Sequence, residues 1–499
     1  MRFLIIIFSF ILLSKSSSAY YEFDANLKSA YSSIISFDFE KSKTLLLKEK
    51  TEKPGNDLVI LYSNYIDFLK AFISEEEKYF DEFKKKSNEN LKLLDKREEN
   101  ITSPFHHYAK AEILIQQALV KVKFREYVSA ATDIRKAYRL IEKNKLAYPE
   151  FLLNNKLSGF LTAVIGAVPR EYHWLVEIAG MEGSVPDGAT ELKTLFKTLE
   201  KSEFSCYREE LLFYLSELYI TFNSNEADLL ECMIYMRPYA AGSTLMRYST
   251  SAILMKMGRN DEAYDYLKDP AAYNTGFPFD FMYYKLALCK LRKLDFSASK
   301  DFEEFIKRFK GQNFIKSSYQ KLAWIESLQN NPQGYYTYMT KCRSLGTAFI
   351  DEDKDAQSEA AAIDIGNKLL LRARLLFDGG YYDKAQLELA GMPVDSFPKY
   401  KDQLEVTYRL ARIYQKTGQE EKAIDLYQKT IDNGASATFY FAANSALLLG
   451  IIYEDKNDLD KSESFYKKCL SMERHQYQNS IDQKAQAGLD RIKILRNPE

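Results

Sequence analysis

The chain has 499 residues, of which 46% are apolar and 28% are charged, and its formal net charge is −1. This composition is that of a globular protein and excludes a disordered chain. The near-neutral charge also argues against nucleic acid as a bulk electrostatic partner.

The N-terminus has the pattern of a secretory signal peptide. Arg2 supplies a positive charge, residues 3–13 form an apolar run, and residues 17–19 are small, as cleavage requires. The run is too short to span a bilayer, which takes about 20 apolar residues. We therefore expect residues 1–19 to be a signal peptide, although retention as a membrane anchor stays open.

Loss of the signal leaves 67 basic against 70 acidic residues, a net charge of −3. No later segment is long and apolar enough to be predicted as a transmembrane helix. We expect the mature chain to be exported to the periplasm or the cell surface, without a transmembrane segment.

Residues 20–185 are expected to form divergent helical repeats. Residues 31–50 contain two helical stretches with a break near Phe37, and residues 126–144 carry alanines among apolar residues at helical spacing. Sustained alternation of apolar and polar residues, which would indicate strands, is lacking. The next segment, residues 180–192, holds three glycines and a proline, and we interpret it as a loop at a boundary.

Five cysteines occur, an odd number, at positions 206, 232, 289, 342 and 469. Disulfide frameworks are typical of small secreted domains that lack a core, and this chain has ample apolar residues. We expect buried free thiols. A bridge between Cys206 and Cys232, which flank one predicted helical hairpin, is the one pairing left open.

Residues 411–431, ARIYQKTGQEEKAIDLYQKTI, hold two amphipathic segments separated by Gly418. Residues three and four apart share one face of a helix, which places Ala411 and Tyr414 together, and Ala423 with Tyr427. Small residues let the two helices cross closely, the rings fill the space beside them, and the glycine allows the turn. The stretch therefore predicts a helical hairpin.

Copies of this pattern recur along the chain. Tyr453, Ser462 and Tyr466 each follow their counterparts by 39 residues. Going backwards, alanines equivalent to Ala423 occur at positions 385, 298 and 263, and a degenerate unit with Tyr335 in place of alanine lies between two of them. Five units in roughly one phase indicate an array in which each hairpin packs on its neighbours.

This small/aromatic signature resembles the tetratricopeptide repeat (TPR), whose unit has 34 residues. Residues 280–430 also look similar to exported TPR proteins of Bacteroidota-like bacteria. The resemblance implies an all-α fold, an α-solenoid built as a right-handed superhelix of helix-turn-helix units. We assign residues 190–499 to it, most regular at 245–470, and expect local rather than distant contacts to stabilise the stack.

No motif in the chain predicts a catalytic, cofactor-binding or metal-binding site. Asp351, Asp353 and Asp355 begin like an EF-hand loop, but Ala356 and Ala362 stand where glycine and a bidentate glutamate are needed. We interpret this stretch as the start of a helix. The adjacent histidines at positions 106 and 107 point in different directions on a helix and do not form a metal site.

Partner binding is expected in the concave groove of the superhelix. Counted from the inner-face residues, the first helices present five side chains of types that are effective in protein interfaces. These candidates are Arg374, Tyr408, Arg412, Gln415 and Asn444. The lysines and asparagines with which some family members clamp a peptide carboxylate are not reproduced here.

We expect a non-enzymatic scaffold or adaptor in the cell envelope that binds a protein or peptide and uses no cofactor. The alternative is a soluble extracytoplasmic receptor for a small molecule or glycan. An enzyme with an unrecognised site, or a cytosolic regulator if residues 1–19 are not a signal, also stays open. Neither the partner, the cellular process nor the oligomeric state follows from the sequence.

Overall fold

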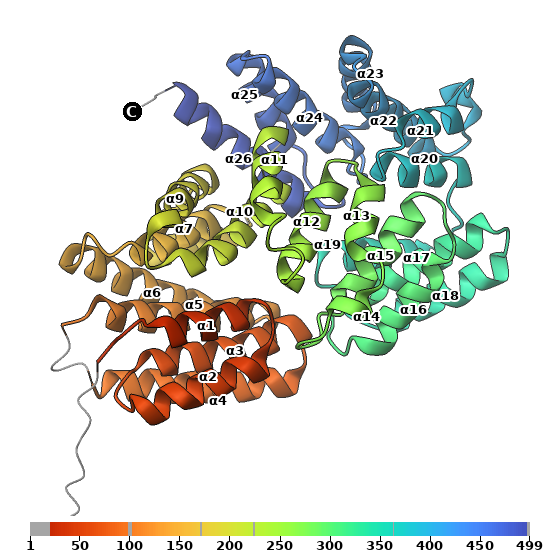
Figure 1. Cartoon of the computed structure of the whole chain (residues 1–499). Coiled ribbons are helices and arrows are strands. Elements are labelled where there is room, and N and C mark those ends of the chain that lie inside the picture. The colour runs from red at the N-terminus through yellow and green to blue at the C-terminus, as the bar shows by residue number, and fades with distance from the viewer. Residues whose placement is uncertain (1–19, 98–101, 170–171, 223–224, 363, 497–499) are drawn as a thin grey trace, which may run out of the picture.

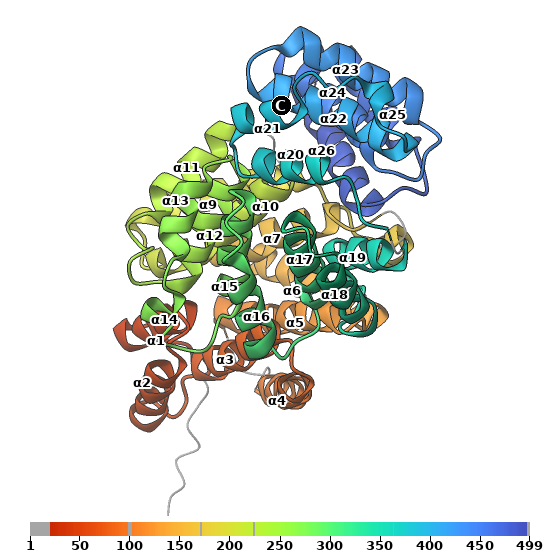
Figure 2. The ribbon, with the colours of Figure 1, turned by 90° about the vertical axis from the view of Figure 1, so that its right-hand side faces the viewer.

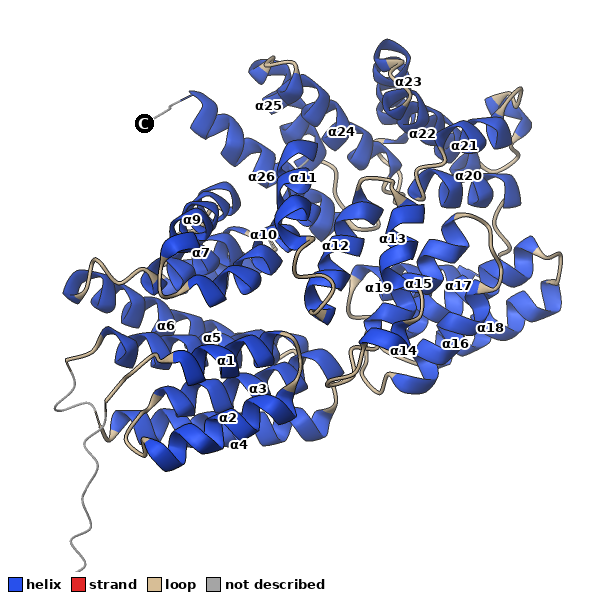
Figure 3. Ribbon diagram, in the orientation of Figure 1, coloured by secondary structure: helices blue, strands red, loops and turns tan. Residues whose placement is uncertain are grey.

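The computed structural model describes residues 20–97, 102–169, 172–222, 225–362 and 364–496. Over these ranges the regular secondary structure is helical, and the one β-type pairing is an isolated bridge between Tyr20 and Asn56 (Figure 3). The chain is an all-α solenoid, as predicted. The proposed signal peptide, residues 1–19, lies outside the described residues.

The N-terminal half consists of helical hairpins, in which a first helix packs on the second helix that follows it. The five hairpins are α1 (Ala25–Ile35) with α2 (Phe39–Glu52), α3 (Leu58–Ser74) with α4 (Glu77–Asp95), α5 (Pro104–Lys123) with α6 (Tyr127–Ala147), α7 (Leu153–Gly166) with α9 (Val185–Thr198), and α10 (Arg208–Phe222) with α11 (Glu226–Met236). Short helix α8 (His173–Ala179) lies between α7 and α9, and single 3-10 turns at Leu199–Lys201 and Ser205–Tyr207 join α9 to α10.

The C-terminal half continues in the same way. Its hairpins are α12 (Thr244–Lys256) with α13 (Asn260–Leu267), α15 (Phe281–Arg292) with α16 (Ala298–Arg308), α17 (Ile315–Leu328) with α18 (Pro332–Ser344), α20 (Lys368–Asp378) with α21 (Tyr382–Leu389), α22 (Tyr400–Lys416) with α23 (Glu420–Gly434), and α24 (Phe441–Asp455) with α25 (Leu459–Leu470). Outside the hairpins lie α14 (Pro270–Tyr273), α19 (Asp351–Ala362), α26 (Gln478–Arg496) and a 3-10 turn at Val394–Ser396.

The segment expected to be a loop, residues 180–192, is mostly helix. Helix α9 begins at Val185, with Pro186 in its first turn, where a missing N–H costs no hydrogen bond. The Ser184 side chain accepts a hydrogen bond from the Asp187 N–H and so caps the helix. The glycine at position 188 serves packing, because an added Cβ would lie 2.5 Å from the backbone of α7.

One left-handed residue makes the turn inside each of several hairpins. Gly418 has φ of 75°, as its position in the repeat predicts, and Gly258 and Gly380 have φ of 73° and 82°. This conformation lets the end of the first helix close its hydrogen bonds while the chain reverses. The same conformation occurs at non-glycine residues in other hairpins, namely Phe37, Glu75, Arg125, Leu294, Asn330 and Asn457.

The alternation of small and aromatic residues packs the helices closely, as the repeat pattern predicts. Ala411, Ala423 and Tyr427 are fully buried. The Tyr466 ring lies between Gly450 of α24 and Gly488 of α26, where a Cβ on either glycine would come within 2.5 Å of the ring. Each ring thus occupies space that a small residue on the neighbouring helix leaves free.

The expectation of purely local contacts is wrong in part, because hairpins far apart in the chain also pack together. Helix α20 contacts α15, and the turn at Gly380 lies directly against the turn at Gly258. Figure 2 shows α17, α18 and α19 grouped to the side of α15 and α20 rather than between them. The close approach depends on glycine, since a Cβ on Gly380 would lie 1.7 Å from the carbonyl oxygen of Gly258.

The two ends of the stack also meet its middle (Figure 1). Glu75, at the end of α3, accepts hydrogen bonds from the backbone N–H groups of Gln312 and Asn313 at 3.3 and 3.1 Å. At the other end, α26 packs on α9 and α10, and Arg491 donates to the carbonyl of Phe222 at 3.2 Å. The solenoid therefore folds back on itself at both ends.

Candidate functional site: the inner surface

Charged side chains from helices α10 to α26 face one another across the inside of the stack. They keep some solvent exposure. The surrounding protein nevertheless desolvates most of them, and their charges interact across helices that are distant in sequence. We name this set the inner surface: Glu217, Lys256, Lys285, Arg292, Lys321, Glu352, Asp355, Glu359, Arg374, Asp378, Arg412, Lys416 and Lys484.

Arg374, one of the five predicted partner-binding residues, lies on this surface beside Trp324. Its guanidinium is 5.0 Å from the centroid of that ring, and Lys321 approaches the same ring at 4.0 Å. The indole N–H of Trp324 donates to Glu359 at 2.8 Å. Burial, and then repulsion from Arg374, lower the pKa of Lys321 to about 8.

Arg412 occupies the equivalent place in the next hairpin of the chain. It stacks over Phe377 at 4.2 Å and lies 3.9 Å from the carboxylate of Asp378. Although burial raises the pKa of Asp378, Arg292, Arg412 and Arg374 hold it below its usual value. A guanidinium that combines ring stacking with partial exposure has donors left for a partner.

The remaining three predicted residues are two partly exposed amides, Gln415 and Asn444, and one buried ring, Tyr408. The Tyr408 side chain is fully buried, so it does not present itself to a partner. Its hydroxyl accepts a hydrogen bond from the Asn444 amide at 2.5 Å, and the Tyr427 hydroxyl donates to Gln415 at 2.7 Å. Tyr408 and Tyr427 thus orient Asn444 and Gln415, which stay partly exposed. Partner binding by the five residues stays a prediction.

The earlier hairpins contribute inner-surface residues that the sequence analysis did not single out, including Lys256, Lys285 and Lys321. A positional signal exists for some of them. Lys256 stands two residues before the left-handed turn residue Gly258, as Lys416 does before Gly418. Because the turn fixes the phase of the first helix, Lys256 and Lys416 occupy equivalent positions in their hairpins.

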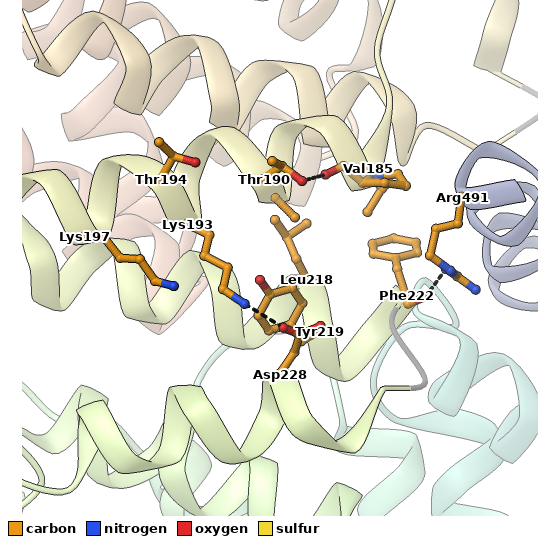
Figure 4. Close-up of a pocket in the computed structure, with 12 residues that line it drawn as sticks. Val185, Thr190, Lys193, Thr194, Lys197, Leu218, Tyr219, Phe222, Asp228 and Arg491 are labelled. Carbon is orange, nitrogen blue, oxygen red and sulfur yellow. Dashed lines mark hydrogen bonds and ion pairs between the residues drawn. The ribbon is translucent and has the colours of Figure 1, made fainter. Parts of the chain in front are cut away.

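A groove opens between α9, α10 and α11, with Arg491 of α26 at one end (Figure 4). Its volume is about 380 Å³. Lys193 crosses it to donate to Asp228 at 2.8 Å and pairs with Glu231 at 2.7 Å. The groove's central charge is therefore already neutralised within the protein.

A fully buried charge network lies deeper in the N-terminal half. The ammonium of Lys156 is 2.9 Å from Glu112 and 2.7 Å from Glu210. The hydroxyls of Tyr31 and Tyr65 donate to these carboxylates, both at 2.6 Å. Lys156 has no exposed surface, so the network joins helices and offers no surface to a substrate. Nothing in the repeat pattern marks these residues, because the pattern concerns apolar and small positions.

Residues weighed for metal or redox chemistry have structural roles. Helix α19 begins at Asp351, as predicted, and Asp353 accepts hydrogen bonds from the N–H groups of Phe314 and Ser317, at 2.6 and 2.8 Å. These contacts cap the start of α17. The sequence did not predict this role for Asp353. In the part of the chain that the structure describes, no three potential ligands gather as a metal site would need.

All five cysteines are free thiols, so the bridge between Cys206 and Cys232 is absent. Burial raises the pKa of both thiols to about 12, which makes them poor nucleophiles. Within the described residues, none of the helices is both long and apolar enough to traverse a bilayer.

Residues 402–474 match the family model described as tetratricopeptide repeat. The match covers α22 to α25 and supports the resemblance to TPR proteins there. Four of the five predicted partner-binding residues lie within the matched residues, and Arg374 precedes them. Such repeats support a role in protein–protein interaction.

Among solved structures, the chain is similar to a protein in the "Crystal structure of APC/C hetero-tetramer Cut9-Hcn1". The TM-score is 0.27 and the identity 12%, over 91% of this chain and 95% of that one. The comparison with curated proteins found no match.

Proposed function

We propose that the protein is a non-enzymatic scaffold in the periplasm or at the cell surface that binds a protein or peptide partner on its inner surface. The observation that carries this proposal is the row of guanidiniums and amides on successive first helices. Arg374, Arg412, Gln415 and Asn444 stay partly exposed and are held in place by buried aromatic residues. Arginine and ordered polar groups on an aromatic base are effective in interfaces.

The location is proposed from the signal-like N-terminus alone. The scaffold role is supported by the match of residues 402–474 to the tetratricopeptide repeat.

The test compares Arg374→Ala with Arg372→Ala on the same helix. Arg372 faces the second helix, where it forms a two-pronged ion pair with Glu388 at 2.7 and 2.9 Å. Tagged wild type and both variants are expressed in the native cell, purified from the envelope fraction, and their partners are identified by mass spectrometry.

We expect Arg374→Ala to weaken capture of the partner by a factor of about 30, the effect of truncating an interface arginine, and Arg372→Ala to leave it unchanged. Circular dichroism confirms that both variants are folded. Capture lost equally in both variants, or a bound sugar or lipid in place of a protein, would contradict the proposal, and the latter result would favour a receptor.

A further inference from the structure

Tyr219 of α10 differs from the other buried tyrosines in the bonding of its hydroxyl. The residue lies in the core and is 7% exposed. The ten other buried tyrosines that the structure describes each have a hydrogen bond at the hydroxyl, as Tyr427 has with Gln415. The Tyr219 hydroxyl makes no hydrogen bond with any described residue. A buried hydroxyl normally has a partner, because an unpaired one costs free energy.

The unpaired hydroxyl opens into the groove between α9, α10 and α11. Tyr219 lines this groove (Figure 4), and its hydroxyl oxygen is not sealed from solvent. A phenylalanine would fill the same place in the core without an unpaired donor. The hydroxyl is therefore available to a ligand that lies in the groove.

The groove is long and narrow. Its lining residues on α9 recur every three or four positions from Val185 to Lys197, so they form one face of that helix. At 1.5 Å per residue this face runs for about 18 Å. A volume of about 380 Å³ over such a length is too small for a helix, which is about 10–12 Å across. An extended chain rises about 3.3 Å per residue, so roughly five extended residues match the length.

The walls of the groove suit an uncharged ligand. Four lining residues supply apolar surface, namely Val185, Ala189, Leu218 and Phe222. The charged lining residues are already paired within the protein. Lys193 pairs with Asp228 and Glu231 at 2.8 and 2.7 Å. Arg491 pairs with Glu454 at 2.7 Å. A charged ligand would have to compete with these pairs, whereas a neutral one would leave them intact.

A peptide matches these features better than an acyl chain does. Tyr219 lies midway along the groove, between the end at Phe222 and the end at Lys197 (Figure 4). An acyl chain carries its oxygen atoms at one end, whereas a peptide presents a carbonyl acceptor at every residue. A peptide carbonyl can accept from Tyr219 while apolar side chains of the same peptide lie against Leu218 and Phe222.

We propose that this groove binds an extended, uncharged, apolar segment of a protein partner, and that the Tyr219 hydroxyl donates to a backbone carbonyl of that segment. The groove contains none of the residues of the inner surface, so it is a separate site from the one in the proposed function.

The experiment pans a phage-displayed library of random heptapeptides against the purified full-length chain. The recovered sequences are synthesised with a fluorescent label, and their affinity is measured by fluorescence polarisation. We expect apolar, uncharged sequences that bind Tyr219→Phe about tenfold more weakly than wild type, the effect of one lost hydrogen bond. Because the hydroxyl has no partner in the ligand-free chain, Tyr219→Phe should keep the wild-type melting temperature.

Tyr214→Phe on the same helix is the matched control. The Tyr214 hydroxyl donates to Glu210 at 2.7 Å, so its loss should lower the melting temperature and leave the affinity for the peptides unchanged. A library that yields no enriched sequence, or peptides that bind wild type and Tyr219→Phe equally, would overturn the proposal.

Native mass spectrometry of the chain purified from its own cells tests the other occupants. Thr194→Trp fills the groove from an exposed position of α9. A lipid adduct that this variant loses would assign the groove to an acyl chain, and a dimer that it dissociates would assign the groove to a second copy. Either result overturns the peptide assignment. Arg374→Ala should leave the affinity for the peptides unchanged, so the groove and the inner surface can fail independently.

Discussion

Lys156 of α7 and Glu210 of α10 meet at 2.7 Å in the interior of the N-terminal half, and both side chains are buried. Glu112 of α5 joins them, and the hydroxyls of Tyr31 on α1 and Tyr65 on α3 complete the set. One lysine thus connects first helices of five hairpins. Burial raises the pKa of Glu112, whereas Lys156 and its neighbours hold the pKa of Glu210 below its usual value despite burial.

Replacing Lys156 with methionine should destabilise the N-terminal half strongly. The change leaves two buried carboxylates without a cation, which costs about 3–5 kcal/mol. Denaturant unfolding followed by circular dichroism measures it. The control, Lys145→Met, removes an exposed lysine whose nearest carboxylate is 4.0 Å away and should change the free energy of unfolding by less than about 0.5 kcal/mol. A cost below about 1 kcal/mol for Lys156→Met would mean that the network contributes little to the stability of the N-terminal half.

Two glycine substitutions should separate backbone strain from close packing. Gly418→Ala places a Cβ at φ of 75° with nothing within 4 Å, so the cost is that of the left-handed conformation, about 1–2 kcal/mol. Gly380→Ala adds a collision with the Gly258 carbonyl at 1.7 Å and should cost at least about 3 kcal/mol. Thermal unfolding of the two variants checks this order. Equal effects would show that the contact between the two turns does not hold α20 in place.

Lys256 should make stability depend on pH in a defined direction. Its pKa is about 7 in the folded chain, below the usual 10.5, so between these values the unfolded chain binds a proton that the folded chain does not. The free energy of unfolding contributed by this group therefore rises with pH from 7 to 10.5, and the penalty is complete below 7.

The variant Lys256→Met lacks this penalty. In chloride buffers it should melt at a higher temperature than wild type at pH 6 to 7, and the difference should shrink as the pH approaches 10.5. A difference that is constant across the range would show that Lys256 is not repelled by Lys484, Arg412 and Lys416.

Arg491→Ala should release the C-terminal helix from the middle of the stack. Arg491 pairs with Glu454 of α24 at 2.7 and 2.9 Å and donates to the carbonyl of Phe222 at the end of α10. Its loss therefore removes a charged link from α26 to each of these two helices. Hydrogen exchange should become about tenfold faster in α26, the change expected for a loss of about 1.4 kcal/mol.

The control, Arg496→Ala, lies on the same helix but pairs only with Asp460 and Glu463 of the neighbouring α25. It should leave exchange in most of α26 unchanged. If the two variants behave alike, the contact with Phe222 does not close the inner surface.

The sequence by itself determined the helical class, the hairpin and its turn. The pairs of small and aromatic residues around Gly418 recur because each hairpin must bury one face against the next. This requirement repeats the same residue types along the sequence at a recognisable spacing. Arg125 and Leu294 adopt the same left-handed turn without glycine, so the period alone did not place them. At these positions packing of the two helices imposes the turn on a residue that does not favour it.

The tertiary structure alone decided what lies inside the stack. The return of α26 onto α10, the contact of Gly380 with Gly258, and the meeting of Lys156 with Glu210 join residues whose separation in the chain follows no repeat. Periodicity records only which face of a helix is covered, not which distant helix covers it. Lys256, Arg412 and Lys484 therefore look like ordinary solvated residues in the sequence, and their charges act on one another only because the solenoid folds back on itself.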